Sequence, residues 1–185
     1  WSADVTYFFN REKITQLTTP QELDNKGNFW FVGHPLTVIY DNNKIGIWQQ
    51  ADVDNGTLKK QTSPVQLPGE IRVEDVDNNG VIDANDRKII GNFQPKWEGG
   101  LTNRISFKGF DVSFVTFARM GMKVVVPYLS GTSGGGSGFG FLNQGRSNQL
   151  VMDYWTPENP TNAFPRPDAG GGVRNFTSTT SYQDG

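Results

Sequence analysis

A stretch of alternating apolar and polar residues between positions 97 and 120 constrains the fold more than any other feature of the sequence. One face of the first arm carries Trp97, Leu101, Ile105 and Phe107, and the other face carries Glu98, Thr102, Arg104 and Ser106. The returning arm places Val112, Phe114, Thr116 and Ala118 on one face, although Val115 and Phe117 interrupt its other face. Lys108 and Gly109 form the connection. Because period two is typical of strands, the stretch predicts an antiparallel hairpin. Each arm has about the 9–11 residues that a tilted membrane strand needs.

Other segments also favour strands. Residues 1–9 alternate with Trp1, Ala3, Val5, Tyr7 and Phe9 on one face, and residues 29–50 hold two apolar runs around a predicted turn at 41–44. A half-buried strand of a soluble protein shows the same alternation, so this pattern alone does not separate a sandwich from a lipid-facing barrel. Long amphipathic helical windows are absent from the sequence, and no run of about 18 apolar residues occurs. We therefore predict an all-β fold.

Composition excludes several functions. The chain has 185 residues and a net charge of −2, so no basic field attracts nucleic acid. It has no cysteine, which removes disulfides, thiolate metal sites and cysteine nucleophiles. The one histidine, His34, stands beside a proline in VGHPL and is interpreted as a turn residue, because no Ser-His-Asp arrangement accompanies it.

Residues 121–185 lose the regular pattern. A glycine-rich string at 131–140 lacks the GxxxxGK[ST] motif of a phosphate-binding loop, and an aromatic, proline-rich string follows at 154–167. A loop of about sixty residues is improbable in a compact soluble domain. Outer-membrane barrels, however, carry long extracellular loops beside short periplasmic turns. The strand-like patterns at both ends lead us to expect an internal part of a longer protein.

The string DVDNNGVIDAND at 75–86 predicts a calcium site. Its oxygen-bearing positions match those of an EF-hand-type loop, with glycine at the sixth position and aspartate in place of the usual glutamate at the twelfth. The predicted ligands are Asp75, Asp77, Asn79, the carbonyl of Val81, Asp83 and Asp86. A strand-like segment precedes the loop and residues 84–90 offer one short helix, so we expect a structural site that joins strands. The alternative is an Asp/Asn-rich turn without an ion. DVDNG at 52–56 has its glycine one position early and is interpreted as a tight turn.

The order of these strings resembles one family. The segment from PGEIRVEDVDNNGVIDANDRKIIGNFQPKWEGG through the hairpin resembles the late-barrel region of SusC/RagA-type TonB-dependent outer-membrane transporters. Gly33-His34-Pro35 followed by IYDNNKIGIWQ, and WTPENP at 155–160, resemble other strings of that family. The likeness touches most of residues 1–168. The glycine-rich insert at 131–140 and GGGV at 170–173 are not family signals.

The resemblance implies part of a large antiparallel transmembrane β-barrel of about 22 strands with a plugged lumen. It divides the chain into barrel strands and loops at 1–120, including the calcium-type loop, and a long extracellular loop at 121–185 that leads to the next strand. It further implies the bacterial outer membrane and energy-coupled import of oligosaccharides or peptides. The implied partners are the remainder of the barrel, a SusD-like surface lipoprotein, and TonB through segments absent from this chain.

Two sets of site residues follow. The residues expected to face lipid are Trp97, Leu101, Ile105, Val112 and Phe114, with aromatic residues such as Trp1, Phe107 and Phe110 near the membrane interfaces. The residues expected to meet substrate or the lipoprotein are Tyr154, Trp155, Pro157 and Asn159. The alternatives are a soluble core for the first set and a loop packed on itself for the second.

Two other classes of protein compete with the importer. A secreted, calcium-stapled carbohydrate-binding β module explains the aromatic content but not the long C-terminal loop. A glycoside hydrolase needs two carboxyl groups at a defined separation, and nothing in the sequence pairs acids such as Glu98 and Glu158. We therefore expect no enzymatic activity.

Overall fold

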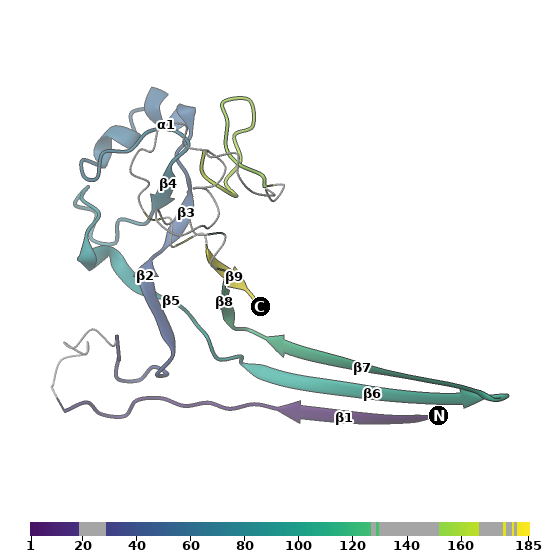
Figure 1. The fold of residues 1–185 in the computed structure, drawn as a ribbon. Coiled ribbons are helices and arrows are strands. Elements are labelled where there is room, and N and C mark those ends of the chain that lie inside the picture. Colours follow the sequence, from purple (N-terminus) through teal and green to yellow (C-terminus); the bar gives the residue numbers. More distant parts are fainter. Residues whose placement is uncertain (19–28, 127–128, 130–151, 167–175, 177–178, 180) are drawn as a thin grey trace, which may run out of the picture. The chain divides into compact units, whose positions relative to one another are not determined.

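A computed structural model describes residues 1–18, 29–126, 129, 152–166, 176, 179 and 181–185 (Figure 1). The chain forms two compact units. The first contains residues 1–39, 91–124 and 184–185, and the second contains residues 40–90 and 125–183. The secondary structure is almost entirely strand, so the all-β prediction is confirmed.

The first unit is built on a three-stranded sheet in the order β1-β6-β7 (Figure 1). These strands are β1 (Ser2–Phe8), β6 (Trp97–Phe107) and β7 (Phe110–Met120). Both pairings are antiparallel. Lys108 and Gly109 join β6 to β7 with φ angles of 49° and 86°. Positive φ at both central residues suits the twist of a two-residue hairpin, and the predicted hairpin and turn are confirmed.

The second unit holds a small core around β3 (Lys44–Ile47) and β4 (Ile71–Val73), which pair antiparallel. The buried apolar residues of this core are Ile47, Ile71, Val73, Ile82 and Trp155. The helical elements are short: α1 (Gln50–Asp54), η1 (Leu58–Lys60) and η2 (Ala84–Asp86). The string at 52–56, predicted as a tight turn, instead contains the end of α1, its C-cap Asn55 and Gly56 at φ 77°.

The turn predicted at 41–44 does not form a hairpin. β2 (Val38–Asn42) pairs with β5 (Arg87–Asn92), whereas β3 pairs with β4. Asn43, between β2 and β3, exchanges hydrogen bonds with Glu74 through its backbone carbonyl and its side-chain amide. These contacts to a distant segment replace the local pairing that the sequence suggested.

Within residues 121–185, the described parts include the paired strands β8 (Lys123–Val125) and β9 (Tyr182–Asp184). They also include residues 152–166, which pack on the core of the second unit through Trp155. The glycine-rich string at 131–140 lies outside the described residues. Among those described, no helix has the length and apolar character to cross a membrane.

Candidate functional site

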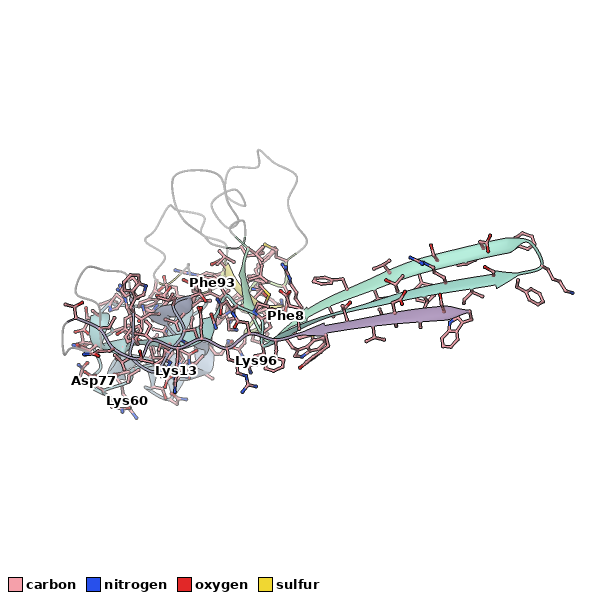
Figure 2. The ribbon with its side chains drawn as sticks, turned by 90° about the horizontal axis from the view of Figure 1, so that it is seen from below. Phe8, Lys13, Lys60, Asp77, Phe93 and Lys96 are labelled. Carbon is pink, nitrogen blue, oxygen red and sulfur yellow. The ribbon has the colours of Figure 1, made fainter. Side chains whose placement is uncertain are left out.

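The predicted calcium loop lies between β4 and β5 in the second unit and includes Asp77, which is labelled in Figure 2. Carboxylate oxygens of Asp75, Asp77 and Asp86 all lie within 4.8 Å of one another. Asp86 is fully buried, Asp75 is half-buried and Asp77 is exposed. The structure therefore brings together three of the six predicted ligands.

Backbone amides shape the first half of this loop. The Gly80 amide donates to Oδ2 of Asp75 at 2.8 Å, and the Asn79 amide lies 3.2 Å from Oδ1 of both Asp75 and Asp77. Gly80 has φ of 79°, and a Cβ there would lie 2.4 Å from the carbonyl oxygen of Lys60. Only glycine fits this position, because both the backbone angle and the close approach exclude a side chain.

The second half of the loop uses its acids as caps. Asp83 accepts a hydrogen bond from the Asn85 amide at 2.7 Å and caps η2. Asp86 accepts from the amides of Asp83 and Val76, both at 2.8 Å. Asp83 lies outside the carboxylate group, while Asn79 Oδ1 accepts from the Val81 amide at 2.6 Å.

The electrostatics of the three grouped carboxylates fit a hard divalent cation. In the part of the chain that the structure describes, no lysine or arginine forms an ion pair with Asp75, Asp77 or Asp86. Three negative charges this close repel one another, and a buried carboxylate without an opposite charge beside it is unfavourable even when it accepts backbone hydrogen bonds. Oxygen ligands of this kind are those that calcium takes.

Trp155 differs from its predicted role as a residue that meets a partner. Its side chain is 6% exposed and packs in the apolar core with Ile47 and Ile71. Its indole Nε1 donates to Oε1 of Gln49 at 2.7 Å. In this structure the Trp155 ring is not accessible to a sugar or a protein from outside, because the loop packs on its own unit.

The neighbours of Trp155 remain at the surface. Tyr154 is 37% exposed, and Pro157 and Asn159 are also exposed. The Asn159 side chain donates to Asp153 at 2.9 Å and to the Tyr154 carbonyl at 3.0 Å. Hydrogen bonds from Thr161 and then Asn159 lower the pKa of the Asp153 carboxyl group.

One face of the β1-β6-β7 sheet is mainly apolar, with Asn103 and Thr116 as polar residues on it. The register places Leu101 opposite Val5 and Thr116, and Ile105 opposite Val112. Trp97, Leu101, Ile105, Val112 and Phe114 therefore share a face, because directly opposed residues point to the same side. Leu101, Ile105, Val112 and Phe114 are between 37% and 57% exposed. Side chains stand away from both faces of this sheet in Figure 2.

The opposite face is mainly polar. Glu98 and Arg119 are directly opposed across β6 and β7 and form an ion pair at 2.8 Å. Phe8, Val115 and Phe117 are exposed apolar residues on this same side. The Arg119 guanidinium lies 5.4 Å from the centroid of the Phe117 ring, so part of this apolar surface is adjacent to a charge.

The sequence did not identify two polar residues of the second unit that connect distant segments. Gln49 and Asn162 connect β3 to the loop at 152–166, with Ile47 N–H donating to Asn162 Oδ1 at 2.9 Å. The strings GIWQ and WTPENP were both recognised, yet nothing local in either string showed that they meet. Covariation between positions 49 and 162 among relatives is the signal that would reveal such a contact.

Two curated TonB-dependent receptors are similar to this chain in sequence, and one solved structure is similar in fold. No protein-family model matches the chain. TonB-dependent receptor P26 of Formosa agariphila is 28% identical over 182 residues, which cover 92% of this chain and 17% of the receptor. TonB-dependent receptor P3 of the same bacterium is 26% identical over 192 residues, covering 98% of this chain and 18% of the receptor.

A solved structure of the RagAB peptide importer in the 'open-open' state has a TM-score of 0.58 at 19% identity, covering 98% of this chain and 18% of that chain. The chain therefore spans less than a fifth of each of these proteins. Together the two receptors and the shared fold confirm the resemblance that the sequence strings carried.

Proposed function

We propose, from the premise that this chain belongs to the SusC/RagA-type TonB-dependent transporter family, that it supplies strands and surface loops to an outer-membrane importer. The observation that carries this proposal is the apolar face of the β1-β6-β7 sheet. Large apolar side chains such as Leu101, Ile105 and Phe114 stay exposed there, which is unfavourable in water. Hydrocarbon removes that cost, so the face meets the outer-membrane lipid.

The dimensions of the hairpin agree with a membrane span. β6 and β7 have 11 residues each. At about 3.3 Å per residue each strand is about 36 Å long, and a tilt of about 40° reduces its height to about 28 Å. That is enough to cross the apolar band of an outer-membrane barrel, which is about 25 Å tall. The polar face, with the Glu98–Arg119 pair, then faces the lumen.

The second unit then belongs to the surface loops, and the importer carries oligosaccharides or peptides together with a SusD-like lipoprotein. The RagAB importer, which shares the fold, is named for peptides. Tyr154, Pro157 and Asn159 are the residues that we assign to contact with substrate or lipoprotein, since they are exposed beside the anchored Trp155. TonB acts through other segments of the importer.

Fractionation of cells that produce the complete receptor tests this proposal. We expect the receptor to stay in the outer-membrane pellet through salt and carbonate washes and to enter solution only with detergent. Uptake of labelled peptides or oligosaccharides by these cells should stop when TonB is deleted. Recovery of the intact receptor in the aqueous fraction would overturn the importer and favour the secreted carbohydrate-binding module.

We also assign a structural calcium ion to the loop at 75–86. Asp75, Asp77 and Asp86 would hold the ion, and Asn79, Val81 and Asp83 would complete its oxygen ligands. The bound ion supplies positive charge between carboxylates that otherwise repel one another. Calcium at about 100 times its dissociation constant stabilises the folded loop by about 2.7 kcal/mol.

Hydrogen exchange of the complete receptor, with calcium or with a chelator, tests the metal. We expect the amides of residues 75–86 to exchange faster after chelation, and Asp77→Asn to weaken the protection by calcium. Asp111→Asn, an exposed acid at the start of β7, is the matched control and should leave the calcium effect intact. Equal exchange with and without calcium would reject the site.

A further inference from the structure

Two strings that are distant in the sequence form one hydrogen-bonded unit in the structure. Gln49 follows β3, and Trp155 and Asn162 belong to the loop at 152–166; we call these three residues the clamp. Trp155 donates to Gln49 across a sequence separation of 106 residues. The clamp lies entirely within the second unit.

Gln49 uses both ends of its side-chain amide in this contact. Its Oε1 accepts from the Trp155 indole at 2.7 Å. Its Nε2 lies 2.9 Å from the Ile47 carbonyl and 3.3 Å from both the Thr161 carbonyl and Asn162 Oδ1. The Gln49 side chain therefore binds the loop at Trp155 and again at Thr161 and Asn162. These contacts fix the distance between the two parts of the loop.

Asn162 supplies the matching contact from the loop. Its Oδ1 accepts from the amide of Ile47, a residue that is 2% exposed. A buried amide without an acceptor is costly, so this contact stabilises the docked loop. Gly46 leaves room for it, because a Cβ at Gly46 would lie only 3.0 Å from Asn162 Oδ1.

The packing beneath the loop allows little adjustment. Gly69 has φ of 84°, and a Cβ there would lie 2.5 Å from Cε3 of Trp155. Arg166, at the far end of the loop, pairs with Glu70 at 3.3 Å, and its amide donates to the Gly69 carbonyl at 2.8 Å. Residues 69 and 70 thus contact the loop both at Trp155 and at Arg166.

The exposed end of the loop is ordered from within. Thr156 and Asn159 exchange backbone hydrogen bonds at 3.1 Å and 3.0 Å, and Asp153 accepts from the side chains of Asn159 and Thr161. We call exposed residues 157–159 the tip. A loop that already holds its bound shape loses less conformational entropy when it binds a partner.

We propose that Gln49 and Asn162 are positioning residues, which hold the tip in the shape that the SusD-like lipoprotein binds. This inference rests on the proposed function, which assigns the loop to contact with substrate or lipoprotein, and it commits to the lipoprotein. Gln49 and Asn162 act through the loop rather than by touching the lipoprotein. Trp155, whose ring is buried in the core of the second unit, anchors the loop.

Affinity of the complete receptor for its lipoprotein in detergent tests the proposal. Gln49→Ala and Asn162→Ala should each weaken the complex about tenfold, because the loop must then be ordered on binding. Asn162→Asp keeps the oxygen that accepts from Ile47 and should retain most of the affinity. Gln50→Ala is the matched control, since the side chain of this exposed neighbour bonds to Asp54 within α1 and, among the described residues, not to the loop.

A double-mutant cycle distinguishes positioning from a general loss of structure. A tip variant in which Pro157, Glu158 and Asn159 are alanine should also weaken binding. Adding Gln49→Ala to the tip variant should weaken binding of the lipoprotein little further, because the clamp acts through the tip. Full additivity would overturn the positioning role, as would a tip variant that binds weakly while Gln49→Ala binds normally. If the tip variant binds normally, the assignment of this loop to the lipoprotein fails instead.

Discussion

Apolar strand residues have opposite environments in the two units. Ile47 and Ile71 of the β3–β4 pair are 2% and 1% exposed, whereas Leu101 and Ile105 of β6 are 37% and 43% exposed. The second unit buries its apolar residues among themselves, so it carries its own core. The sheet of the first unit places similar side chains on a face that its own described residues leave open. The comparison teaches that the same alternation specifies a self-sufficient core in one unit and a surface for an apolar environment in the other.

Removing the largest core side chain should produce the largest effect on the second unit. Trp155→Ala is expected to destabilise the second unit by about 3–5 kcal/mol, because the ring fills the core and its indole N–H donates a hydrogen bond to Gln49. Hydrogen exchange of the β3 and β4 amides in the complete receptor measures this loss. Trp1→Ala, at a residue that is 83% exposed in the other unit, should leave those amides unchanged. Unaltered exchange in Trp155→Ala would remove the contrast between the units.

A charge on the apolar face of the sheet should be nearly as harmful. Leu101→Arg is expected to cost about 2–4 kcal/mol if the residue lies at mid-bilayer depth. Thr102→Arg, on the neighbouring residue and the opposite face, is the matched control and should cost much less. Folding of the complete receptor into lipid vesicles, followed by denaturant titration, measures both. Equal effects of the two arginines would contradict a lipid-facing side.

A partly exposed ion pair beside the loop at 75–86 should give the smallest effect. Hydrogen bonds from Lys88 and Asn43 lower the pKa of Glu74 below its usual value of 4.5. A carboxyl group with a lowered pKa stabilises the folded state at pH values above its usual pKa. This contribution disappears as the pH falls through the pKa of the folded state. The Glu74 side chain is 36% exposed, so we expect less than about 1 kcal/mol.

The comparison of Glu74→Gln with the unaltered receptor tests this contribution. The local stability of the two proteins, measured by hydrogen exchange in β4 and β5, should differ at neutral pH and converge in acid. A difference that persists at low pH would show that the amide disturbs packing rather than removing charge.

Local pattern was sufficient where structure follows from neighbours in the sequence. The β6–β7 hairpin, its Lys108–Gly109 turn and the shared apolar face all follow from period two and turn chemistry. The grouping of Asp75, Asp77 and Asp86 followed from their spacing around Gly80. In each case the contacts are close in the sequence, so local rules specify them.

The same local rules gave wrong predictions where long-range contacts determine the structure. Residues 41–44 look like a hairpin turn, but the strands on either side pair with β5 and β4 instead. Trp155 looks like an exposed aromatic residue in a loop, but the core formed by Ile47 and Ile71 buries it. Each outcome depends on residues that are distant in sequence.

Site-directed spin labelling of the complete receptor in lipid vesicles tests the central claim, the lipid contact of one face of β6 and β7, most directly. In a receptor without other cysteines, to which this chain contributes none, single cysteines are placed at Leu101, Ile105 and Val112 on one face and at Thr102 and Ser113 on the other. We predict that labels on the first face collide mainly with oxygen dissolved in the bilayer and little with a water-soluble nickel complex. Equal access of the nickel complex to both faces, or protection of the first face from both reagents, would contradict the claim.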